Sequence, residues 1–230
     1  MNSLAAKLRT RLTAVADPDR APGMQAYMKS AMPYLGVSAV PLRAVCKQMF
    51  SGLLYADSAT WQRDVLDIWH GAQFREERHA AIELTGIRAA RSFQTVEALG
   101  LYEEMIVTGA WWDYVDAIAT QRFWPILQHD PAAMKHRMLA WASDDDMWKR
   151  RSAILSQLKA KAETDLDFLY ACIEPSLDST EFFLRKAIGW ALRQYAWTDP
   201  AEVKRYVAAN EARLSGLSKR EALKNIRGSR

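Results

Sequence analysis

The segment WWDYVDAI, residues 111–118, ends in an alanine followed by an aliphatic residue, and this pair recurs along the chain at a nearly constant distance. Successive pairs lie 37, 36, 36, 34 and 35 residues apart. They are Ala44-Val45, Ala81-Ile82, Ala117-Ile118, Ala153-Ile154, Ala187-Ile188 and Ala222-Leu223. A period of this length is typical of solenoids built from pairs of helices, in which a small residue lets neighbouring helices approach closely.

The rest of the sequence also follows a helical pattern. Apolar residues recur at spacings of three and four, as in Val65, Ile68 and Trp69, and no convincing run alternates apolar with polar residues. Proline and glycine divide the chain into short helices, and Asp130-Pro131 and Asp199-Pro200 have the form of helix starts. The sequence therefore predicts an all-α helical repeat solenoid of about six helix pairs, with residues 1–230 in a single domain.

Composition narrows the class of protein. With 50% hydrophobic and 25% charged residues, the chain fits an ordinary soluble protein. It lacks an apolar stretch of the roughly 18 residues that span a bilayer, and Leu4, Leu8 and Leu12 predict a first amphipathic helix instead of a signal peptide. Two distant cysteines, Cys46 and Cys172, are typical of a reduced compartment. We expect a cytoplasmic protein without membrane contact.

Four residues fall on the side of the repeat helices away from the alanine pairs. At about 100° per residue, Trp112, Asp116, Arg151 and Trp190 project within a sector about 140° wide. Because they belong to three successive repeats, stacking would bring them onto one wall of the solenoid. The same sector contains two acids, Glu83 and Glu221, and many cations: Lys47, Lys159, Arg185, Lys186, Arg193, Arg220 and Lys224. The net formal charge of +4 indicates a mild preference for an anionic partner.

Structural interpretations compete with a functional one at each of these positions. A tryptophan at helical spacing is usually a core residue, as Trp111 and Trp141 could be, and Asp116 could form a solvated salt bridge. The run Lys149-Arg150-Arg151 is typical of a solvated face. The chain has no metal-ligand spacing among its histidines, no glycine-rich phosphate loop and no nucleophile motif, so we predict no metal and no cofactor. These residues alone leave an enzyme, a DNA-binding module and a protein-interaction scaffold as alternatives.

Several segments resemble the AlkD family of DNA alkylation repair glycosylases, which have a HEAT-like repeat fold. The resemblance covers nearly the whole chain. Its strongest parts are Val107–Asp116, Trp148–Leu155 and Glu181–Trp190. The C-terminal segment Leu217–Lys224 and the early segments Tyr27–Lys29 and Leu35-Gly36 also resemble family segments. It implies an enzyme of base excision repair that acts on double-stranded DNA containing alkylated bases. We expect a monomer with a concave basic face, associated with the nucleoid when bound to DNA.

The resemblance also implies roles for individual residues. Trp112 and Trp190 match two aromatic residues that flank the lesion nucleotide, and Asp116 matches the essential carboxylate. Arg151 matches an arginine of the active cleft that contacts DNA, and Tyr27 an aromatic residue near that cleft. Together with the basic sector, it assigns phosphate contacts to Arg185, Lys186, Lys219, Arg220 and Lys224. Residues 38–40 differ from the family pattern.

The implied substrates are purines alkylated at N3 or N7, such as 3-methyladenine, 7-methylguanine and bulkier adducts. Their positive charge already weakens the N-glycosidic bond, so the base can leave without a protonating side chain and without being enclosed. A carboxylate such as Asp116 would stabilise the oxocarbenium ion and hold the attacking water. Each tryptophan face would contribute about 0.5–2 kcal/mol towards binding the cation. The alternative is a non-catalytic module for distorted or branched DNA.

Overall fold

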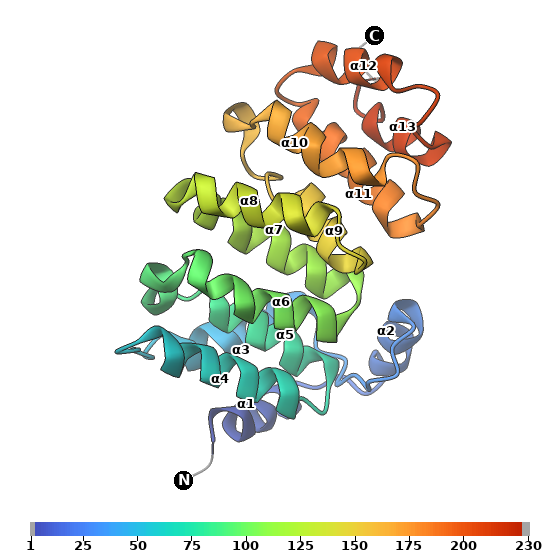
Figure 1. The fold of residues 1–230 in the computed structure, drawn as a ribbon. Coiled ribbons are helices and arrows are strands. Elements are labelled where there is room, and N and C mark those ends of the chain that lie inside the picture. Colours follow the sequence, from blue (N-terminus) through green and yellow to red (C-terminus); the bar gives the residue numbers. More distant parts are fainter. Residues whose placement is uncertain (1–2, 227–230) are drawn as a thin grey trace. The chain divides into compact units, whose positions relative to one another are not determined.

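The computed structural model describes residues 3–226 as α-helices, short 3₁₀-helices and turns, with no strand in that range. The all-α prediction is confirmed. Contacts divide the chain into two compact units, Met1–Leu101 and Tyr102–Arg230, and the boundary falls within α6 (Leu99–Gly109) (Figure 1).

Within residues 3–226, no helix is both long enough and apolar enough to cross a membrane.

The first unit begins with the predicted amphipathic helix. Helix α1 (Leu4–Thr13) buries Leu8 and Leu12 completely and packs against α3, α4 and α5. The later elements of this unit are α2 (Ala21–Met28), α3 (Ala39–Phe50), α4 (Ser58–Gly71), α5 (Arg75–Thr85), and the 3₁₀-helices η1 (Arg88–Phe93) and η2 (Val96–Ala98).

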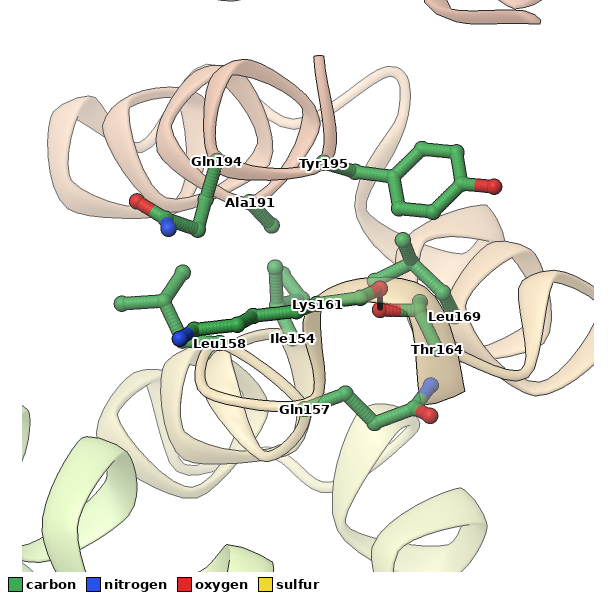
Figure 2. Close-up of a pocket in the computed structure, with 9 residues that line it drawn as sticks. All are labelled: Ile154, Gln157, Leu158, Lys161, Thr164, Leu169, Ala191, Gln194 and Tyr195. Atoms are coloured by element: carbon green, nitrogen blue, oxygen red, sulfur yellow. Dashed lines mark hydrogen bonds between the residues drawn. The ribbon is translucent and has the colours of Figure 1, made fainter. Parts of the chain in front are cut away.

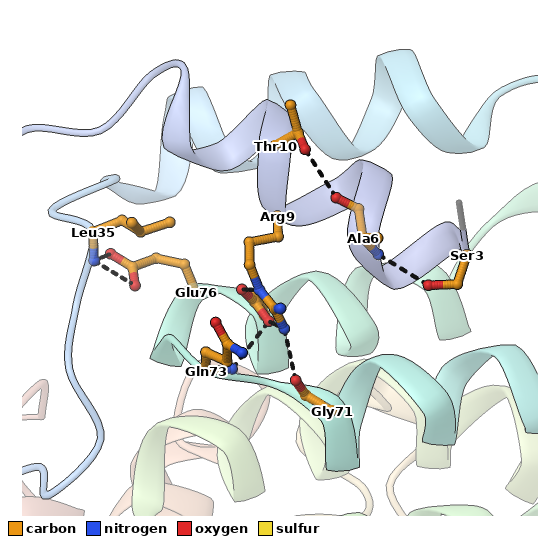
Figure 3. A network of polar contacts seen from close by, with 9 residues as sticks. Ser3, Ala6, Arg9, Thr10, Leu35, Gly71, Gln73 and Glu76 are labelled. Carbon is orange, nitrogen blue, oxygen red and sulfur yellow. Dashed lines mark hydrogen bonds and ion pairs between the residues drawn. The ribbon is translucent and has the colours of Figure 1, made fainter. Parts of the chain in front are cut away.

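Two buried carboxylates at the start of α5 hold the N-terminal part of this unit in place. Arg9 of α1 donates from Nε and Nη2 to Glu77, at 2.7 and 2.9 Å, and from Nη2 to the carbonyl of Gly71 at 2.7 Å. Glu76 accepts the backbone N–H groups of Leu35 and Val37 at 3.0–3.1 Å, as Figure 3 shows in part. Because both glutamates are only 1% exposed, these bonds offset the cost of burying them.

The second unit contains two rows of helices. Helices α7 (Trp112–His129), α9 (Met147–Leu155), α11 (Phe182–Tyr195) and α13 (Gly216–Ala222) contact one another in sequence order, and α8 (Pro131–Ala142), α10 (Leu166–Ile173) and α12 (Pro200–Ala209) alternate with them (Figure 1). The 3₁₀-helices η3 (Lys161–Glu163) and η4 (Glu174–Ser176) flank α10. Asp130 and Asp199 cap α8 and α12, each followed by proline at the first helical position, as predicted.

The alanine pairs mark alternate helices, as a repeat of helix pairs requires. They lie in α3, α5, α7, α9, α11 and at the end of α13, and the chain is an α-α helical repeat. Ala81, Ala153, Ala187 and Ala222 are buried. The predicted packing role fails at Ala44, which is exposed, and Leu223 lies just outside α13. Terminal repeats have a neighbour on one side only, so the pattern is weakest there.

Gly189 brings α11 and α13 into close contact. A Cβ added at this position would lie 2.5 Å from Cβ of Glu221 and 3.0 Å from the carbonyl oxygen of Ser218. The hydroxyl of Ser218 donates to the carbonyl of Arg185 at 3.0 Å, joining the same two helices. Gly189 therefore has a steric role between the two helices.

We predict that Gly189→Ala destabilises the chain by about 1–3 kcal/mol, because α13 must move to make room for the methyl group. Urea unfolding followed by circular dichroism measures the change. Gly100→Ala is the matched control, since a Cβ at that helical position would meet nothing within 4 Å. An unchanged stability of Gly189→Ala would contradict the close contact between α11 and α13.

Candidate functional site

Asp116 of α7 and Arg151 of α9 form a two-point ion pair. Arg151 donates from Nε to Oδ1 of Asp116 at 2.7 Å and from Nη2 to Oδ2 at 2.8 Å. Their side chains are 15% and 5% exposed, respectively. The pairing joins two successive repeats, and it leaves part of the carboxylate accessible while the guanidinium is nearly enclosed.

The remaining terminal nitrogen of Arg151 reaches a third repeat. Its Nη1 donates at 2.5 Å to the backbone carbonyl of Phe183, in the first turn of α11. The guanidinium carbon also lies 5.9 Å from the centre of the Phe183 ring. Because every side-chain nitrogen of Arg151 donates to a fixed acceptor, the arginine determines the orientation of Asp116.

Three aromatic rings pack beside this ion pair. The Trp111 ring lies 6.2 Å from the Trp148 ring and 5.7 Å from the Phe183 ring, and the last two are 5.0 Å apart. Trp111 directly precedes α7 and follows Ala110, whose φ of 42° turns the chain sharply between α6 and α7. The cluster explains Trp111 as a packing residue, and Trp141, which is almost fully buried, is likewise a core residue.

The surroundings of Asp116 raise its pKa above the ordinary aspartate value. Burial is the largest cause, since it disfavours the charged form, and the nearby Asp113 acts in the same direction. The hydrogen bonds and positive charge of Arg151 oppose the shift without cancelling it. The carboxylate is therefore a stronger base than an exposed aspartate.

The two predicted lesion-flanking tryptophans are partly exposed. Trp112 is the first residue of α7 and precedes Asp116 by four residues, which places both on one face of the helix. Trp190 lies in α11, four residues after Lys186 and three before Arg193. Both aromatic side chains thus remain accessible from solvent in the unit that contains the ion pair.

The residues predicted to contact phosphates differ in how available their side chains are to an external anion. Lys186 pairs with Glu221 at 3.0 Å, and Lys219 donates to the carbonyl of Glu211 at 3.2 Å. Nε of Arg185 is buried without a hydrogen-bond partner. Arg220 and Lys224 are exposed and form no ion pair with any residue in the range 3–226. Of the five, these last two are the most available to an external anion.

The basic run 149–151 is part of the folded structure and does not form the solvated face that its composition suggests. Lys149 pairs with Glu103 at 2.7 Å and Asp144 at 2.5 Å, and its ammonium lies 5.5 Å from the Trp141 ring. Arg150 donates to Ser176 and to the carbonyl of Pro175. Sequence reasoning missed these partners because each lies in a different helix or turn.

Tyr27 and Lys47 belong to the first unit. Tyr27, near the end of α2, is 77% exposed. Lys47 lines a hollow of about 260 Å³ between α3 and α5, together with Arg43 and Arg88, and no ion pair within residues 3–226 occupies these three cations. The first unit therefore also offers exposed positive charge on helices that contain the alanine pairs.

A second hollow lies between the C-terminal ends of α9 and α11, where Ile154 and Leu158 lie opposite Ala191 and Gln194, and the Tyr195 ring extends above Leu169 (Figure 2). Its free volume of about 10 Å³ suits a single water molecule, so it cannot enclose a purine. Neither cysteine offers a nucleophile, since both are buried and free, and burial raises the pKa of Cys46 and Cys172 to about 12. Asp116 therefore remains the candidate residue for any chemistry at this site.

We predict that Arg151→Met destabilises the chain by about 2–4 kcal/mol, because it leaves a mostly buried carboxylate unpaired. Asp116→Asn is expected to cost less, since the amide still accepts a hydrogen bond from Arg151. The double variant should lose at least about 1 kcal/mol less than the sum of the two single losses. Urea unfolding of all four proteins measures this coupling, and strictly additive losses would show that the pair contributes nothing.

Comparisons with known proteins show the family of the chain and a solved structure with a similar fold. A model of the family described as DNA alkylation repair enzyme matches residues 8–226. A solved structure, a predicted DNA alkylation repair enzyme from Enterococcus faecalis, is 28% identical with a TM-score of 0.83, over 93% of this chain and 98% of that one. No curated protein sequence matches the chain. Because the family model spans nearly the full sequence, the chain belongs to the DNA alkylation repair enzyme family.

Proposed function

We propose that this protein is a DNA glycosylase of the AlkD type, with HEAT-like repeats, that removes positively charged N3- and N7-alkylated purines from duplex DNA. The observation that carries the proposal is the carboxylate of Asp116, which is held by Arg151 and still partly exposed, in the unit that also contains the two partly exposed tryptophans. Membership of a DNA alkylation repair family supports the substrate class.

The proposed reaction needs one fixed negative charge. The cationic base leaves C1′ with the bonding electron pair and becomes neutral, and positive charge develops on the deoxyribose. Asp116 stabilises this charge and orients a water molecule, which adds to C1′ and gives its proton to the carboxylate or to solvent. Burial strengthens both effects, because it raises the basicity of Asp116 and weakens solvent screening.

Arg151 is better suited to positioning Asp116 than to a direct contact with DNA. Its guanidinium is nearly enclosed, and its three nitrogens donate to Asp116 and Phe183. The positive charge also offsets the repulsion between Asp116 and the DNA phosphates. We therefore propose Arg151 as a positioning residue, which revises the role that the family resemblance implies.

The tryptophans and the exposed cations would provide recognition. Trp112 and Trp190 present ring faces to the cationic nucleotide. The phosphates are bound by cations of the same unit, namely Arg185, Lys186, Lys219, Arg220 and Lys224. We propose, from the family resemblance, that the protein excises the base without enclosing it. Tyr27 would add an exposed aromatic contact. We propose a monomer acting on double-stranded DNA in base excision repair.

We predict that the wild-type protein releases 7-methylguanine from a methylated duplex and that Asp116→Asn lowers the single-turnover rate by about 10²–10³-fold. Duplex binding should persist in the variant, because the aromatic and basic contacts remain. Chromatography of the released base measures the rate, and a gel-shift assay measures binding.

Two results would contradict this proposal in different ways. Binding without release by the wild-type protein would favour the non-catalytic module for distorted or branched DNA. Equal release of uncharged lesions, such as uracil or hypoxanthine, would exclude a mechanism that depends on the charge of the leaving base.

We also predict that the single-turnover rate, corrected for protein-free depurination, falls as the pH is lowered. Asp116 acts in its ionised form, so activity is present above its pKa and lost below it. Because burial raises this pKa, the loss should begin at a higher pH than for an ordinary aspartate. A series of rates across the acidic range checks this, with Asp116→Asn as the control that lacks the inflection. A rate that rises on acidification would exclude Asp116 as the ionised group.

A further inference from the structure

Glu221 of α13 joins two cations of α11. Its Oε1 lies 3.0 Å from Nζ of Lys186, and its Oε2 accepts a hydrogen bond from Nη1 of Arg193. The three side chains are between 18% and 37% exposed, so the cluster lies at the surface. One carboxylate thus occupies the space between two positive groups.

The two cations of the cluster share a helix face with Trp190, one of the proposed recognition residues. Lys186, Trp190 and Arg193 follow one another at spacings of four and three, which places them on one face of α11. The missing Cβ of Gly189 allows Cβ of Glu221 to approach this face closely. The carboxylate is therefore held against the face of α11 to which Trp190 belongs, by packing as well as by charge.

A carboxylate bound by one lysine and one arginine has the partners that a phosphate would take. Both anions accept charge-assisted hydrogen bonds from these donors, and both are held through two or more oxygen atoms. Two cations and one acid leave a local charge of +1, so Glu221 halves the positive charge that this face of α11 offers to DNA. No other acid is paired with either cation among residues 3–226.

We propose that Glu221 is an internal competitor for a DNA phosphate between Lys186 and Arg193, and that it lowers the affinity for undamaged duplex. The inference rests on the proposed function of this surface. A duplex must displace the carboxylate or share its cations, and only a duplex that also engages Trp112, Asp116 and Trp190 recovers that cost. Glu221 thereby favours lesions over undamaged DNA.

Glu221→Gln tests this by removing the charge while keeping the shape of the side chain. The salt dependence of binding to undamaged duplex should steepen by about 0.9 in the slope of log K against log salt, which corresponds to one additional phosphate contact. Affinity for undamaged duplex should rise more than affinity for methylated duplex. Glu211→Gln is the matched control, because it makes the same change of charge at an exposed residue whose side chain pairs with neither cation.

The outcomes separate this inference from the proposed function. If the wild type binds and releases 7-methylguanine while Glu221→Gln binds like Glu211→Gln, or more weakly than the wild type, the competitor role is wrong and the glycosylase stands. Binding without release overturns the enzyme alone, and no duplex binding by the wild type overturns both. Should Glu221→Gln fail to fold, Glu221→Ala decides by the same comparison with the wild type: a slope steeper by about 0.9 is expected, and an unchanged slope overturns the inference.

Discussion

The ion pair between Asp116 and Arg151 is the constraint on which the second unit depends. Removing a carboxylate and a guanidinium from water is costly, and the cost is offset only where the geometry satisfies both groups. Here Arg151 donates to both oxygens of Asp116 and to the carbonyl of Phe183. Because these acceptors lie in α7 and α11 while the arginine lies in α9, the pair requires three successive repeats to be stacked in register.

The packing around the pair follows from this requirement. Trp111, Trp148 and Phe183 pack beside it, so the polar contacts lie next to apolar surface, where electrostatic interactions are less screened. Small residues let the helices approach closely enough, as Ala153, Ala187 and Gly189 do in α9 and α11. A bulkier residue at these positions would separate the helices and lengthen the bonds of Arg151.

Local features of the sequence predict the fold well, whereas contacts between repeats escape such reasoning. Each Ala-aliphatic pair and each of the capping residues Asp130 and Asp199 lies within or at the start of one helix, and the structure confirms both the caps and the recurrence of the pairs on alternate helices. Helical angles also place Asp116 and Arg151 in one sector. They do not reveal that Arg151 is enclosed or that Glu221 binds Lys186, because these partners are about 35 residues apart and their rotamers depend on packing. Ala44 shows the limit of local pattern in the first unit, because it belongs to an Ala-aliphatic pair like the buried alanines and is nevertheless exposed.

The proposed chemistry, in which no pocket encloses the base, places particular demands on charge. A bare carboxylate on a surface that binds DNA would be repelled by phosphates, and a fully neutralised one would do little for an oxocarbenium ion. The arrangement of Asp116 and Arg151 meets both demands, because the arginine lies inside, 5% exposed, and the carboxylate outside, 15% exposed. At the distance of the phosphates the two charges largely cancel, whereas a sugar in contact with Asp116 meets the negative end of the pair first. The proposed selectivity for cationic lesions then follows from the orientation of one ion pair and does not require a cavity shaped to the base.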